Sequence, residues 1–119
     1  MDTRILITGG LGQLGSELSD TLRQRYGDSN VMVTDIRQPS EPPDRFQILD
    51  ARDGERLSEI VQTERITRIY HLAALLSAVA EDRPQAAWDI NMRGLTAVLE
   101  VARESGCSVF TPSSIPGRI

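Results

Sequence analysis

The chain has 119 residues, the usual length of one domain, and 39% of them are apolar, which is enough to build a core. A net charge of −4 offers no basic surface for nucleic acid, and no apolar run approaches the ~20 residues that span a bilayer. The one cysteine, Cys107, cannot form an internal disulfide, and its apolar surroundings predict a buried thiol. No Cys/His cluster has metal-ligand spacing, so we expect no metal, and the lack of a signal-peptide pattern favours a cytoplasmic protein.

A glycine-rich turn near the N-terminus is the most informative stretch. The pattern predicts an apolar strand over residues 4–8 and a helix over residues 11–26. The strand-to-helix turn carries glycines at spacings of three, at Gly9, Gly12 and Gly15. One face of the helix carries a leucine at every fourth position, at Leu14, Leu18 and Leu22. Glycine lets a ligand approach the backbone, and the first amide groups of a helix attract anions. The turn therefore predicts a site for a pyrophosphate.

An acidic residue follows at the distance that a dinucleotide site requires. A second strand is expected over residues 30–35, ending in Asp35, twenty positions after Gly15. A carboxylate there accepts hydrogen bonds from both hydroxyls of an adenosine ribose and repels a 2′-phosphate, so it favours NAD over NADP. Arg37 could lie against the adenine or tolerate a 2′-phosphate, and Asp35 favours the first. The alternative is an ordinary turn with a surface aspartate, but the order and spacing of these features favour a nucleotide site.

The remaining elements continue the alternation of strands and helices. After a proline-rich loop over residues 38–44, strands are expected over residues 46–49, 68–72 and 108–111. Helices are expected from Asp53 or Gly54 to about Glu64, and from about Pro84 to Ser105, leaving a turn-like end over residues 112–119. This pattern predicts an α/β fold, a single Rossmann-type domain over residues 1–119 with a doubly wound parallel sheet. Right-handed crossovers give the strand order 3-2-1-4-5, truncated after strand 5.

Several motifs follow strand ends and should meet at one edge of this sheet. They are TGGLGQLG at residues 8–15, Asp35, LDA at residues 49–51, HLAA at residues 71–74 and PSS at residues 112–114. A further motif residue, Asn91, belongs to the last expected helix. With these motifs the chain resembles the N-terminal part of the extended short-chain dehydrogenases/reductases, the NAD-dependent epimerase/dehydratase group. The glycine turn, Asp35 and the segment ALLSA at residues 74–78 are especially similar to the short-chain type of L-threonine 3-dehydrogenase.

The resemblance implies a cofactor, NAD, and a set of site residues. Contacts to the cofactor are implied for Gly9, Gly12, Gln13, Leu14, Asp35, Ile36, Arg37, Asp50, Ala51, Leu72, Ala73, Ala74 and Asn91. Ser77 is implied to line the substrate pocket. The implied reaction is oxidation of the secondary alcohol of L-threonine, with hydride transfer to NAD, in enzymes expected to be homodimers. There a Tyr–Lys pair is the base, and a hydroxyl at the position of Ser114 binds the same oxygen.

This sequence departs from the family pattern in its last part. It contains no lysine, so the Tyr-x-x-x-Lys pair is absent, and it ends shortly after the expected fifth strand. We therefore expect a truncated product or fragment that is inactive alone. Two alternatives stay open: part of a nucleotide-sugar epimerase or dehydratase, with a small-molecule substrate of that class, and a non-enzymatic NAD-binding module.

Four single residues have competing interpretations. Asp50 could be an adenine ligand, a loop acid or a helix cap. His71 is expected to be a packed, hydrogen-bonded histidine rather than a catalytic one. Asn91 could bind strand backbone or cofactor, because a buried amide must be satisfied. Trp88 is expected to anchor a core or an interface rather than to stack on a ligand.

Overall fold

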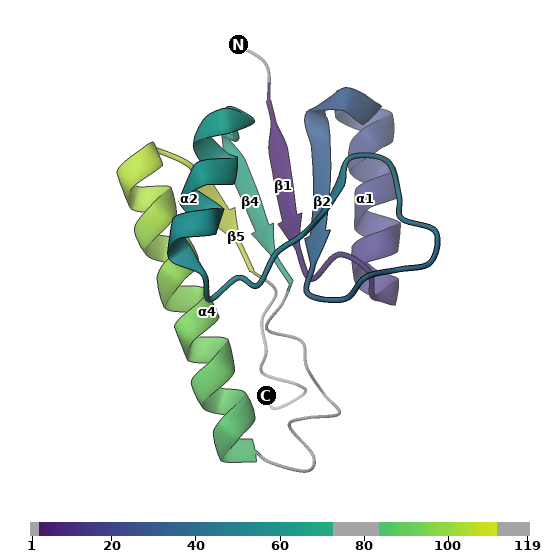
Figure 1. The fold of residues 1–119 in the computed structure, drawn as a ribbon. Helices are drawn as coiled ribbons and strands as arrows, with labels where there is room; N and C mark the ends of the chain where they lie inside the picture. The colour runs from purple at the N-terminus through teal and green to yellow at the C-terminus, as the bar shows by residue number, and fades with distance from the viewer. Residues whose placement is uncertain (1–2, 73–83, 112–119) are drawn as a thin grey trace, which may run out of the picture.

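The computed structural model describes residues 3–72 and 84–111 and contains a five-stranded parallel sheet with helices on both faces (Figure 1). The strands are β1 (Ile5–Thr8), β2 (Val31–Asp35), β3 (Phe46–Ile48), β4 (Arg68–His71) and β5 (Ser108–Phe110). Their order in the sheet is β3-β2-β1-β4-β5, and every neighbouring pair is parallel. The predicted doubly wound α/β fold and its strand order are confirmed.

The helices cover the two faces unequally. Helix α1 (Gln13–Tyr26) packs on one face, followed by the short 3-10 helix η1 (Asp28–Asn30). Helices α2 (Gly54–Thr63) and α4 (Pro84–Ser105) pack on the other face and against each other (Figure 1). Because β1 and β2 are central and covered on both sides, all their residues are buried, which explains their uninterrupted apolar runs.

Two apolar clusters form the core, one on each face of the sheet. On the α1 face lie Ile5, Ile7, Leu22, Val31, Val33 and Leu72. On the face of α2 and α4 the larger cluster contains Leu6, Met32, Leu57, Ile69, Val98 and Val101 among others. Alternate residues of β1 point to opposite faces, so this one strand contributes to both clusters.

Helix α1 begins two residues later than expected. Gly12 is its N-cap, with an extended backbone (φ −73°, ψ 177°), and the helix proper starts at Gln13. The expected leucine stripe is only partly inside: Leu22 is buried, Leu18 packs at the margin of the core, and Leu14 is 48% exposed. Leu14 lies in the first turn of α1 and belongs to neither apolar cluster of the described residues.

The prediction of a buried thiol at Cys107 is wrong. Cys107 precedes β5 rather than lying within it, and it is only partly buried. Its Sγ lies 3.1 Å from the carbonyl oxygen of Ile66, to which the thiol donates, and burial raises the pKa of the thiol. The turn at Gly106, which has a φ of 76°, brings the chain to the rim of the core instead of through it.

No helix within residues 3–72 and 84–111 is long and apolar enough to cross a membrane. Within the same residues, no group of three or more His, Cys, Asp or Glu side chains is placed to hold a metal ion.

Candidate functional site

Two glycines of the N-terminal turn are required by the chain's own packing. A Cβ atom at Gly10 would lie 2.6 Å from Cγ1 of Val33, and a Cβ at Gly15 would lie 2.6 Å from the Cα atom and carbonyl oxygen of Gly10. Gly9 has a φ of 66°, a conformation that other residues rarely adopt. The amide of Gly10 donates to the carbonyl of Thr34 at 2.9 Å, which fixes the turn against β2. These contacts explain the close approach of α1 to the sheet.

Gly12 is different, because nothing in the described residues 3–72 and 84–111 requires a glycine there. Among those residues a Cβ atom at Gly12 would meet no atom within 4 Å, and its φ of −73° suits any residue. The space over Gly12 adjoins the N-terminus of α1, which has no side-chain cap and no acidic residue in its first turn. The first amide groups of a helix have no helical partners and carry partial positive charge. This arrangement suits an anion that approaches the backbone closely.

Asp35 lies at the carboxyl end of β2, directly beside this turn. Its side chain is 5% exposed and accepts the amide of Leu11 at 3.1 Å through Oδ2, which links the carboxylate to the glycine turn. Oδ1 accepts the amide and Nε of Arg37 at 3.1 and 3.2 Å. Burial opposes ionisation of Asp35, yet hydrogen bonds from the Arg37 side chain and from the two amides outweigh it and lower the pKa of Asp35. The carboxylate is therefore charged and preorganised at neutral pH.

Asp50, which follows the next strand, is also paired with the arginine two residues later in the sequence. It follows β3, and its carboxylate accepts the amide, Nε and Nη2 of Arg52, the last at 2.6 Å. Hydrogen bonds from the Arg52 side chain lower the pKa of Asp50. The cap of α2 is Asp53, whose Oδ1 accepts the amide of Arg56 at 3.1 Å, so Asp50 is not the helix cap. Ala51, between the paired residues, is buried in the core.

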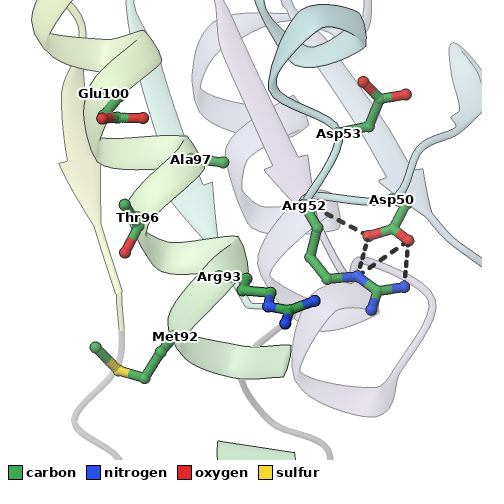
Figure 2. A pocket seen from close by; sticks show the side chains of 8 residues that line it. All are labelled: Asp50, Arg52, Asp53, Met92, Arg93, Thr96, Ala97 and Glu100. Carbon is green, nitrogen blue, oxygen red and sulfur yellow. Dashed lines mark hydrogen bonds and ion pairs between the residues drawn. The ribbon is translucent and has the colours of Figure 1, made fainter. Parts of the chain in front are cut away.

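An open hollow of about 650 Å³ lies between the start of α2 and α4, next to this pair (Figure 2). The α2 side contributes Asp50, Arg52 and Asp53, and α4 contributes Met92, Arg93, Thr96, Ala97 and Glu100. In Figure 2 the guanidinium of Arg93 extends from α4 toward the Asp50–Arg52 pair. The hollow places charged groups of both signs beside Asp50.

His71 and Asn91 place unpaired polar atoms in the interior. His71 is 1% exposed, and its Nδ1 lies 2.8 Å from Oγ1 of Thr8, in agreement with the expected packed, hydrogen-bonded histidine. Burial lowers the pKa of His71, so the ring is neutral at pH 7. Its Nε2 and the Oδ1 of Asn91 are buried without a hydrogen-bond partner in the described part of the chain. The ring packs beside Gly94 of α4, where a Cβ atom would lie 3.7 Å from Cε1 of His71, an ordinary contact distance.

The carboxyl ends of β1, β2, β3 and β4 lie along one edge of the sheet, because all four strands are parallel (Figure 1). The expected residues that the structure describes follow those ends or begin α1, apart from Asn91 on α4. They are Gly9, Gly12, Gln13, Leu14, Asp35, Ile36, Arg37, Asp50, Ala51 and Leu72. Four expected positions, Ala73, Ala74, Ser77 and Ser114, lie outside the described residues, as does the turn-like end over residues 112–119.

Sequence reasoning missed the pairing of Asp50 with Arg52. The signal was present, because Asp35-Ile36-Arg37 and Asp50-Ala51-Arg52 are two copies of one Asp-x-Arg pattern, each near a strand end. In both copies the arginine donates its amide and Nε to the aspartate two residues earlier.

Residues 5–115 match the model of the NAD dependent epimerase/dehydratase family. The chain belongs to this family. An uncharacterized epimerase/dehydratase of Staphylococcus saprophyticus is 50% identical over 116 residues, which are 94% of this chain and 36% of the relative. One from Staphylococcus epidermidis is also 50% identical, over 117 residues, with the same coverage. The chain therefore spans just over a third of the length of these relatives.

Solved structures of the family have the same fold. L-threonine dehydrogenase from Clostridium difficile is 48% identical, with a TM-score of 0.87 over 96% of this chain and 37% of that one. A GalE-like L-threonine dehydrogenase from Cupriavidus necator, in its holo form, is 45% identical, with a TM-score of 0.85 over 94% of this chain and 37% of that one. UDP-glucose 4-epimerase from Thermus thermophilus, in complex with NAD, is 28% identical, with a TM-score of 0.73 over 87% of this chain and 35% of that one. NAD is the cofactor of this family, and the open backbone over Gly12 and the charged Asp35 fit it.

Proposed function

We propose that the chain binds NAD along the carboxyl edge of its sheet. The pyrophosphate lies over Gly12 at the N-terminus of α1, held by amide groups of the first turn around Gln13 and Leu14. The adenosine ribose donates its hydroxyls to Asp35. The observation that carries the proposal is that Gly12, unlike Gly10 and Gly15, has no role in the packing of the described residues, which leaves the space over it open to a ligand among them.

The other expected residues take their roles from their places along this edge. Ile36 and Arg37 follow Asp35 and lie beside the adenine, whose amino group donates to Asp50 next to Ala51. Leu72, with Ala73 and Ala74, passes beside the cofactor, and the unpaired Oδ1 of Asn91 is available as an acceptor. When bound, NAD supplies a hydride acceptor, and this chain's part is to bind and orient it.

We further propose that the complete enzyme oxidises a secondary alcohol of the L-threonine type and acts as a homodimer. Identities of 48% and 45% to L-threonine dehydrogenases, against 28% to a UDP-glucose 4-epimerase, support this over the nucleotide-sugar alternative. Ser114 would bind the reacting oxygen and Ser77 would line the substrate pocket. Residues 1–119 form one NAD-binding domain in this proposal. The cytoplasmic location and the absence of a metal stay predictions.

The test is calorimetric titration of NAD into the chain and into its Gly12→Val variant. We expect binding to the wild type and none to Gly12→Val, because a side chain there occupies the proposed space of the pyrophosphate, where a Cβ atom meets none of the described residues. The thermal midpoint of Gly12→Val should stay close to that of the wild type. A folded Gly12→Val variant that binds NAD as tightly as the wild type would contradict the proposed position of the phosphates.

A further inference from the structure

The carboxylate of Asp35 has its hydrogen-bonding positions filled by the chain's own donors. Two bonds come from backbone amides, that of Leu11 to Oδ2 and that of Arg37 to Oδ1, both at 3.1 Å. Two more come from the guanidinium of Arg37, from Nε to Oδ1 at 3.2 Å and from Nη2 to Oδ2 at 3.3 Å. An ionised carboxylate accepts about four hydrogen bonds. A ribose that donates two hydroxyls to Asp35 must therefore replace two of these donors.

The two kinds of donor differ in how readily they can leave the carboxylate. The amide of Leu11 belongs to the glycine turn and that of Arg37 to the backbone just after β2, so neither can leave unless the main chain moves. The side chain of Arg37 is 63% exposed, whereas that of Asp35 is 6% exposed. The guanidinium therefore lies between the carboxylate and solvent. An ion pair with so exposed a partner adds little stability, so the guanidinium is the donor that a ligand can displace.

We propose that the guanidinium of Arg37 holds the two positions on Asp35 that the ribose hydroxyls of NAD take, and that it leaves the carboxylate when they bind. This inference rests on the proposed NAD site and adds to it a residue that sets the preference for ribose hydroxyls. In the exchange two N–H donors are replaced by two O–H donors, while both backbone amides stay in place. The nearly buried charge of Asp35 thus keeps its hydrogen bonds with and without the ligand. The released guanidinium is free to lie beside the adenine.

Asp50 and Arg52 provide a comparison within the same chain. Arg52 also donates its amide and its guanidinium to the aspartate two residues earlier. The side chain of Asp50, however, is 41% exposed and accepts a single backbone amide among the described residues. It therefore keeps room for a further donor, and an adenine amino group can bind it without displacing Arg52. The exchange is a property of the nearly buried Asp35.

The test is calorimetric titration of ADP and its 2′,3′-dideoxy analogue into the wild type and into Arg37→Met. Both probes carry the same charge and the same adenine, so the ratio of their affinities reports on the ribose hydroxyls alone. Methionine keeps an unbranched stem but donates no hydrogen bond. We expect Arg37→Met to raise the ratio of ADP to dideoxy-ADP affinity about two- to fivefold, the factor by which an exposed ion pair typically shifts an equilibrium. Arg52→Met is the matched control and should leave the ratio unchanged.

A measurement without ligand checks that Arg37 pairs with Asp35 in solution. Burial opposes ionisation of Asp35 and the Arg37 side chain favours it, so NMR titration should show a higher pKa of Asp35 in Arg37→Met than in the wild type. Because Arg37 is exposed, the thermal midpoint should change little. An unchanged pKa of Asp35, or an equal affinity ratio in the wild type and Arg37→Met, would overturn the exchange. If the wild type binds NAD, either result leaves the proposed function standing, whereas a wild type that binds neither NAD nor ADP would overturn both.

Discussion

His71 is the most informative single residue because it is the chain's only histidine and is almost completely buried. Burial lowers its pKa in the folded protein, so the ring stays neutral there while it charges at its ordinary pKa of about 6.5 in the unfolded chain. At a pH between the pKa of His71 in the folded protein and its pKa in the unfolded chain, the unfolded state binds more protons than the folded state. Stability is therefore complete above the unfolded pKa and falls as the pH drops below it.

This difference predicts a loss of stability between pH 7 and pH 5. The free energy of unfolding should fall below about pH 6.5, with a slope of at most about 1.4 kcal/mol per pH unit from this one group. Urea unfolding at pH 7.5, 6.5 and 5.5 measures it. His71→Gln removes the titrating group and should flatten the slope in this range, even if it lowers stability at every pH. If the free energy of unfolding of His71→Gln fell with pH as steeply as that of the wild type, the loss of stability would come from groups other than His71.

At the scale of the elements, the strand–turn–helix unit of β1 and α1 separates structural glycines from the ligand-facing one. A Cβ atom at Gly15 would lie 2.6 Å from the backbone of Gly10, whereas a Cβ at Gly12 would meet no atom of the described residues within 4 Å. Overpacking typically costs 1–3 kcal/mol, and exchanging an N-cap glycine for alanine costs less. Gly15→Ala should therefore lower the free energy of unfolding by about 1–3 kcal/mol and Gly12→Ala by less than about 1 kcal/mol. Urea unfolding compares the two, and equal losses would refute the distinction.

Most elements could be predicted because their apolar patterns and glycine boundaries agree with the fold. The strand order followed from the handedness of crossovers, which depends on no single side chain. The errors came from features that depend on three-dimensional packing. Leu14 fits the helical leucine stripe, yet it lies in the first turn of α1, which extends past the apolar layer. Cys107 lies at the margin of the core because the backbone turns at Gly106, directly before it. The Asp50–Arg52 pair depends on side-chain conformations that an apolar pattern does not specify.

At the scale of the whole molecule, the proposed NAD site lacks the Tyr–Lys pair that the family resemblance implies. The chain contains no lysine, so no Tyr–Lys pair can act, and a serine hydroxyl is too weakly acidic to replace it. A positioned acid–base group contributes typically 10²–10⁴-fold, and substrate orientation contributes further. The purified chain should therefore show no NADH formation at 340 nm with L-threonine. Turnover that persists through further purification and disappears in Ser114→Ala would contradict this expectation.

The most direct test of an NAD site at this edge is the comparison of NAD with NADP by calorimetry. Asp35 is charged, nearly buried and fixed by the amides of Leu11 and Arg37, so it should accept the ribose hydroxyls of NAD and repel the 2′-phosphate of NADP. We predict that NAD binds more tightly than NADP, and that Asp35→Asn weakens NAD binding and narrows the difference. Binding of NADP as tight as that of NAD, or unaltered selectivity in Asp35→Asn, would contradict the site.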